Sequence, residues 1–223
     1  MTLRVQLGWL AALTLLIAEA WAQPGAGVSA PTAHGVVEDA TRRVMAVVEE
    51  AQAYADKDPE RYYRQVQTIL DPVIDFRGFA RGVMGPYASS ERYRSLDEAG
   101  RAQLRDQLDR FTEVMRLGLV RTYSKGLLAY AGARIELAEP DPAEADQSFV
   151  SVQQLIYTGE AEPYEILYQM GRDKSGDWKL RNVIIESVNL GEIYRNQFEA
   201  AAREQNGDLD AVIDNWTTVE VET

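Results

Sequence analysis

The side chains most often used in catalysis and metal binding are scarce in this chain. It has no Cys, and its one His, His34, stands beside a segment rich in Pro, Gly, Ala and Ser. The common zinc sites need several Cys or His ligands, and no Cys is present to act as a nucleophile. A Ser-His-Asp arrangement would have to recruit His34, and a histidine beside such a segment is far more often solvated than catalytic. We therefore expect no catalytic residue, no metal ion and no cofactor.

Carboxylates are the one abundant kind of reactive side chain. Two of them held at the right separation can hydrolyse a glycosidic bond, and such a pair is recognised by its geometry. A solvated, charged surface is nevertheless the better interpretation of each cluster. An exported carboxylate-dependent hydrolase is kept as an alternative. The two clusters are Asp141, Glu144 and Asp146, and Glu160, Glu162 and Glu165.

The first residues have the layout of a secretory signal peptide. Arg4 precedes the short apolar run Leu7–Ala18, and Ala20 and Ala22 place small residues before a cleavage point. The run is far shorter than the ~20 residues that a membrane-spanning helix needs. We therefore predict a cleaved signal peptide at 1–22, a flexible leader at 23–32, a single domain at 33–218 and a tail at 219–223.

Charge and cysteine content narrow the class of protein further. The 223-residue chain has a formal net charge of −12, whereas nucleic-acid-binding proteins carry a basic surface. We therefore expect no nucleic-acid partner. An exported protein without Cys has no disulfide framework, which favours a bacterial periplasm over a disulfide-dense extracellular setting.

Helical periodicity dominates the chain up to about Tyr123. Apolar residues recur at three- and four-residue spacing from Val36 onwards. Asp58 before a Pro predicts the start of a second helix, and Asp75 caps a third, short one. The capping-box sequence that begins at Ser95 opens a long helix.

The period then changes from helix to strand and back. Apolar and polar residues alternate over successive segments joined by short links, which favours an antiparallel sheet. The order of helices, strands and helices predicts an α+β fold, with a strongly twisted antiparallel sheet of about four strands and helices packed on it. The predicted strands are Arg134–Ala138, Ser148–Thr158, Pro163–Gly171 and Trp178–Leu190, and the closing helices are Leu190–Gln205 and one from Asp208 to Trp216.

The last two strands carry more apolar surface than one buried face requires. In Tyr164–Met170, every second residue is large and apolar, with Leu167 on the other side. In Val183–Val188, both faces carry apolar groups. An ordinary core covered by helices on both sides explains this pattern most simply, and a bound apolar ligand is the alternative.

The segment from Trp178 to Phe198 also resembles a known family. It reads WKLRNVIIESVNLGEIYRNQF, and is similar to the strand-to-helix signature near the C-terminus of the MlaC family of periplasmic phospholipid carriers, also called the toluene-tolerance family. Ile69–Tyr87 resembles the family's segment before its long helix, and Leu96–Tyr123 resembles that long helix, so that the resemblance covers most of the mature chain. It implies an NTF2-like sheet with a helical subdomain in the long N-terminal half.

The resemblance implies a non-enzymatic function in lipid transport. The protein would be a periplasmic monomer that carries a phospholipid by its acyl chains. It would travel between an outer-membrane lipoprotein complex and an inner-membrane ABC lipid transporter, and so serve outer-membrane lipid asymmetry. The residues expected to line the lipid pocket are Phe76, Phe79, Val83, Met84, Phe111, Met115, Tyr123, Ile166, Tyr168, Val183 and Ile185.

Three other functions remain open from the residues alone. The first is the carboxylate-dependent hydrolase, which would show convergent carboxylates in a polar cleft. The second is a carrier of another apolar ligand, such as a hopanoid or a long-chain fatty acid. The third is a structural or adaptor domain with a filled core and no pocket.

Overall fold

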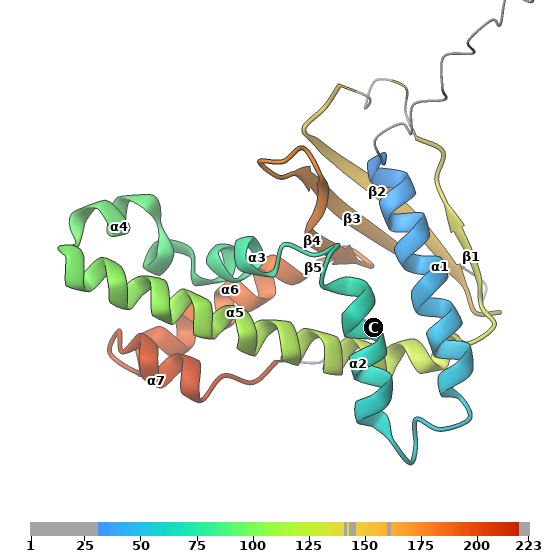
Figure 1. The fold of residues 1–223 in the computed structure, drawn as a ribbon, viewed down its shortest axis with the longest axis horizontal. Coiled ribbons are helices and arrows are strands. Elements are labelled where there is room, and N and C mark those ends of the chain that lie inside the picture. Colours follow the sequence, from blue (N-terminus) through green and yellow to red (C-terminus); the bar gives the residue numbers. More distant parts are fainter. Residues whose placement is uncertain (1–30, 141, 143–145, 160–161, 219–223) are drawn as a thin grey trace, which may run out of the picture. The chain divides into compact units, whose positions relative to one another are not determined.

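The computed structural model describes residues 31–140, 142, 146–159 and 162–218 (Figure 1). The predicted signal peptide and the tail lie outside this part, and so does the leader apart from residues 31 and 32. Three members of the carboxylate clusters, Asp141, Glu144 and Glu160, also lie outside it. The predicted α+β class is confirmed by the order of the elements.

Helices make up the described part of the chain before the sheet, and most begin at a capping side chain. Thr32, Asp58 and Asp75 each accept a hydrogen bond from the backbone N–H three residues further on, which satisfies a donor that a helix start leaves unpaired. These elements are α1 (Ala33–Ala51), α2 (Pro59–Leu70), α3 (Phe76–Met84), the short 3-10 helix η1 (Gly85–Ala88), α4 (Ser90–Ser95), α5 (Glu98–Leu127) and the 3-10 helix η2 (Leu128–Tyr130).

The start of the long helix differs from the sequence prediction. Ser95 is the last residue of α4, and its hydroxyl donates to the carbonyl of Arg92 at 2.8 Å. Asp97 is the N-cap of α5 instead and accepts from the N–H of Gly100 at 2.8 Å. The capping-box pattern was therefore wrong by two residues, because an aspartate nearer the helix can cap it equally well.

The sheet of the described residues has five antiparallel strands in the order β1-β2-β3-β4-β5. Neighbouring strands in the sequence are neighbours in the sheet, as the short links predicted. In Figure 1, α1 lies across one face of this sheet, which we call the inner face. The strands are β1 (Arg134–Leu137), β2 (Phe149–Tyr157), β3 (Tyr164–Arg172), β4 (Trp178–Ile185) and β5 (Val188–Asn189), followed by α6 (Leu190–Glu204) and α7 (Leu209–Asp214).

The last predicted strand is interrupted by a tight turn. Glu186 and Ser187 have φ angles of 46° and 70°, and the chain reverses there so that Val188 pairs with Ile185. The prediction of one strand from Trp178 to Leu190 was therefore wrong in this respect. A continuous strand would have put Val188 on the opposite face from Val183 and Ile185, whereas all three pack against the same cluster.

Replacing Ser187 with Gly should stabilise this turn. A two-residue hairpin turn with positive φ at both positions favours Gly, whereas a side chain in that region is strained. We expect Ser187→Gly to raise the free energy of unfolding by about 0.5–1 kcal/mol in urea titrations. The matched control is Ser175→Gly, in the turn between β3 and β4, which should change stability less. A loss of stability in Ser187→Gly would contradict the turn geometry.

Three buried clusters hold the described part together. The helical cluster joins α3, α5, α6 and α7 around Phe111, Tyr194 and Phe198. The second joins α1, α2 and α5 around Val48, Tyr62 and Val66. The third packs the first turns of α1 against β2, β3 and β4. The space between the second and third clusters is therefore bounded by α1 and the inner face of the sheet.

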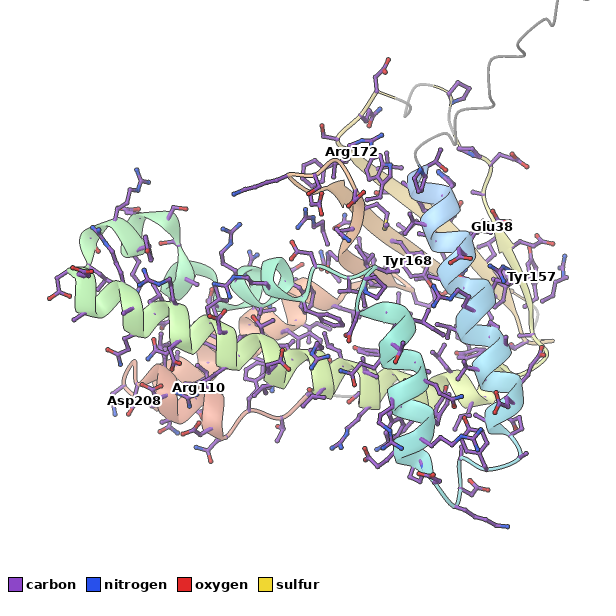
Figure 2. All side chains as sticks on the ribbon, in the orientation of Figure 1. Glu38, Arg110, Tyr157, Tyr168, Arg172 and Asp208 are labelled. Carbon is purple, nitrogen blue, oxygen red and sulfur yellow. The ribbon has the colours of Figure 1, made fainter. Side chains whose placement is uncertain are left out.

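Asp210 ties α7 to α5. Its carboxylate accepts from Gln107 at 2.9 Å, from Arg110 at 2.6 Å and from Gln103 at 3.3 Å. The hydrogen bond from Gln107, with those from Arg110 and Gln103, lowers the pKa of Asp210. Figure 2 labels Arg110 in the region where α5 and α7 are in contact.

Because its pKa is lowered on folding, Asp210 stabilises the fold when ionised, and that contribution is lost as pH falls through the folded pKa. We expect Asp210→Asn to lower stability at pH 7 by less than about 1 kcal/mol, since exposed pairs contribute little. The native protein should melt at a higher temperature than Asp210→Asn at pH 7, and this difference in melting temperature should narrow as pH falls below about 4. A difference that stays constant down to pH 3 would contradict this role.

Candidate functional site

A cavity of about 620 Å³ lies between α1, α2, the C-terminal half of α5 and the inner face of the sheet. This volume falls within the ~300–1,000 Å³ that small-molecule pockets span. The wall is built from the apolar stripes of the helices and from alternate residues of the strands. The cavity thus occupies the space between the second and third buried clusters.

Four residues of β3 form the centre of the sheet wall. Tyr164, Ile166, Tyr168 and Met170 all line the cavity, as expected for alternate residues of one strand. The pairing register extends this wall on both sides. Ile166 pairs with Gln154 of β2 and with Ile185 of β4, and Tyr168 pairs with Val183, which is again a lining residue.

The helical wall reaches the protein surface at one end of α5. Lys125 and Gly126 are exposed, whereas the other described lining residues are buried or half-buried. Tyr130, just beyond, packs edge-on against Tyr164 with ring centroids 5.9 Å apart. We call this end, formed by Lys125, Gly126, Tyr130 and Tyr164, the outer end of the cavity.

The ionisable side chains of the described lining are Lys125, Arg181 and four tyrosines. In the described part of the chain, neither Asp nor Glu contributes to it, and the described residues contain no group of three or more potential metal ligands. Glu165, from one of the predicted carboxylate clusters, accepts a hydrogen bond from Gln153 on the opposite face of the sheet. The cavity can therefore hold an apolar molecule, but its walls offer no pair of carboxylates for hydrolysis.

A short hydrogen-bonded chain crosses the otherwise apolar wall. The hydroxyl of Tyr168 donates to Oε1 of Gln154 at 2.8 Å, and Nε2 of Gln154 donates to Oγ1 of Thr41 on α1 at 2.9 Å. Burial raises the pKa of Tyr168, so its hydroxyl stays protonated and remains a donor. Figure 2 shows Tyr168 on the sheet beside α1.

A second pair of hydroxyls lies where α5 meets α6. Tyr123, which lines the cavity, is 3.2 Å from Tyr194 between their hydroxyl oxygens. Burial is the main cause that raises the pKa of both hydroxyls, so neither ionises near neutral pH. The pair therefore adds polarity to the wall without adding charge.

The eleven residues expected to contact lipid fall into two groups. The structure brings one group together around the cavity and places the other in the helical cluster, where α6 and α7 cover them. Lipid contact by either group stays a prediction. Phe76, Phe79, Tyr123, Ile166, Tyr168, Val183 and Ile185 line the cavity, whereas Val83, Met84, Phe111 and Met115 do not.

Other lining residues were not singled out from the sequence. Val44 of α1 and Val66 of α2 belonged to apolar stripes, and nothing in a stripe distinguishes a cavity wall from a packed core. Gln154 gave a weak signal, because it is a polar residue at an inward position of an alternating strand. Only the hydrogen bond in the folded structure shows that it faces Thr41.

The fold and the cavity together define a class of protein, in which an antiparallel sheet and helices enclose an apolar binding cavity. Among the described residues, none of the helices combines the length and the apolar character that a membrane span requires. Comparison with protein families then identifies the chain more closely.

Residues 38–218 match the model of the MlaC protein family, and the chain belongs to this family. It is 30% identical over 190 residues to the toluene tolerance protein ttg2D of Pseudomonas putida, which covers 85% of this chain and 81% of that protein. It also matches the structure of a phospholipid-binding protein from Ralstonia solanacearum in complex with a phospholipid. That match has a TM-score of 0.60 and 21% identity, and covers 82% of this chain and 93% of the other. At this identity the structural match supports the fold.

Proposed function

We propose that this protein is a periplasmic carrier that holds a phospholipid by its acyl chains in the cavity between α1 and the sheet. The observation that carries the proposal is a cavity of about 620 Å³ whose described lining is mostly apolar, lacks carboxylates and reaches the surface at Lys125 and Gly126. In this arrangement the acyl chains are buried, and the head group stays in water at the outer end.

The energetics of lipid transfer require such a cavity. Two acyl chains of about 16 carbons would cost roughly 25 kcal/mol in water, at about 0.8 kcal/mol per methylene. A carrier that crosses an aqueous compartment must hide most of this surface. Its cavity should be nearly as apolar as a bilayer, so that extraction and delivery have similar free energies. Binding of this kind requires no catalytic group.

Family membership and the N-terminal sequence support the location and the route. The predicted signal peptide directs export, and the Ralstonia relative is described as phospholipid-binding. We propose that the carrier acts as a monomer and exchanges lipid with an outer-membrane lipoprotein complex and an inner-membrane ABC lipid transporter. It has no nucleic-acid partner and is not an enzyme.

Native mass spectrometry of the purified mature protein, followed by extraction and lipid analysis, tests this function. We expect a near-stoichiometric diacyl phospholipid. If the bound molecule were a hopanoid or a single fatty acid, the protein would be a carrier of that apolar ligand and not of a phospholipid. A protein that purifies empty, and that takes no lipid from labelled vesicles, would contradict the carrier function altogether.

A further inference from the structure

Gln154 is an unusual residue for the wall of a lipid cavity. Its side chain is 2% exposed and lines the cavity from the inner face of β2. A buried amide costs free energy unless its hydrogen-bonding groups are paired, so that an apolar ligand alone would favour Leu or Met here. The position therefore calls for an explanation beyond packing.

The hydrogen bonds of Gln154 leave one donor unused. The amide has one acceptor oxygen and two N–H donors. The oxygen accepts from Tyr168, and one N–H donates to Thr41. Nothing in the described residues accepts the second N–H.

A second unused donor lies on the facing wall. Ser124 of α5 is 1% exposed and lines the same cavity, and its hydroxyl has no hydrogen-bond partner among the described residues. A buried donor without a partner destabilises the structure that contains it. A ligand with oxygen acceptors would satisfy both donors, whereas a pure hydrocarbon would leave them unpaired.

Both donors lie near the outer end of the cavity. Ser124 directly precedes the exposed Lys125. Gln154 is two residues along β2 from Ile156, which pairs with Tyr164 of the outer end, so it lies about 6.6 Å inside that row. In a diacyl phospholipid, the ester carbonyls stand between the phosphate and the acyl chains. With the phosphate in water, these carbonyls would enter the first rows of the cavity.

We propose that Gln154 and Ser124 donate hydrogen bonds to the acyl-ester carbonyls of the bound lipid, and so make the cavity selective for ester-linked over ether-linked lipids. This inference rests on the proposed function. It makes Gln154 a specificity-determining residue and assigns Thr41 and Tyr168 the task of holding its amide in place.

The test uses the full mature protein and two phosphatidylglycerols with identical 16-carbon chains, one diacyl and one dialkyl. The protein is incubated with vesicles of an equimolar mixture, and the bound lipids are counted by native mass spectrometry. One neutral hydrogen bond corresponds to roughly a threefold to tenfold preference, so with two donors we expect the diacyl lipid in excess by at least that factor. Gln154→Leu should lower the ratio by about threefold to tenfold and leave the smaller preference that Ser124 supplies.

Three further variants separate recognition from folding. Ser124→Ala breaks no bond of the described structure, so it should fold and should lower the ratio by about twofold to threefold. Thr41→Val removes one of the two bonds that hold the amide but keeps the amide itself, so the preference should weaken and still exceed that of Gln154→Leu. Gln153→Leu, on the opposite face of the same strand, is the matched control and should leave the ratio unchanged.

Other results would overturn either the ester selectivity or the carrier function. Equal binding of the two lipids by the native protein would overturn the inference and leave the carrier function standing. Gln154→Leu lowering both lipids equally, with the ratio preserved, would give Gln154 a structural role and overturn the inference as well. Failure of the native protein to bind either lipid would overturn the proposed function itself.

Discussion

Val183→Asp should abolish lipid binding while leaving the protein folded. Val183 of β4 lines the cavity beside Tyr168 and is half-buried, so its substitute faces the cavity. In the empty protein the new carboxylate can be hydrated by water in that space. Acyl chains would displace this water, and an unpaired buried carboxylate costs several kcal/mol. Since each 1.4 kcal/mol is tenfold in affinity, we expect the affinity for phospholipid to fall by about a hundredfold or more, so that the purified variant retains almost no lipid.

The neighbouring residue offers a matched control. Ile184 follows Val183 on the same strand and is also half-buried. It does not line the cavity, and it pairs with Leu167 on the sheet face opposite the inner face. Ile184→Asp introduces the same charge one residue away and should retain lipid. Native mass spectrometry measures occupancy, and thermal melting checks that both variants fold. Lipid retained in a folded Val183→Asp variant would remove this wall from the proposed site.

Phe111→Ala should cost stability instead of lipid binding. Phe111 of α5 is fully buried and makes edge-on contacts with Phe198 and Trp216, with ring centroids 4.9 and 5.1 Å away. Removing a buried Phe costs about 3–5 kcal/mol, because the lost burial is compounded by the cavity that remains. Urea titration should show this loss, and the folded fraction should still bind lipid.

Phe79→Ala is the corresponding variant at the cavity. Phe79 of α3 lines it and is half-buried, so truncation should cost less stability but weaken lipid binding. The two variants together therefore test whether the helical cluster serves stability and the cavity serves lipid binding. The two variants are compared under conditions in which the same fraction of each is folded. If Phe111→Ala then lost as much lipid as Phe79→Ala, the helical cluster would belong to the binding site.

Much of the fold could be predicted from local patterns. The caps at Asp58 and Asp75 depend on neighbouring residues only, and the alternation along β3 is enough to assign its large apolar residues from Tyr164 to Met170 to one face. The Glu186–Ser187 turn could not be predicted, because neither residue is the Gly or Asn that such turns favour.

The site was harder to predict than the fold, because a cavity wall and a packed core use the same residues. Met84 and Met115 are as apolar as Ile166, and only the positions of α6 and α7 determine that they are covered by helices. The polar residues of the cavity wall could not be predicted for a different reason. Thr41 and Gln154 are 113 residues apart, and only the folded chain brings them within hydrogen-bonding distance.

Photocrosslinking tests the central claim, that the acyl chains occupy the cavity between α1 and the sheet, most directly. A phospholipid with a photoreactive group on one acyl chain is loaded into the mature protein, irradiated, and the labelled peptides are identified by mass spectrometry. We expect labels on α1, on β3 and β4 around Ile166, Tyr168 and Val183, and on the C-terminal half of α5. Labels confined to α4, α7 or the residues around Phe111 would contradict it.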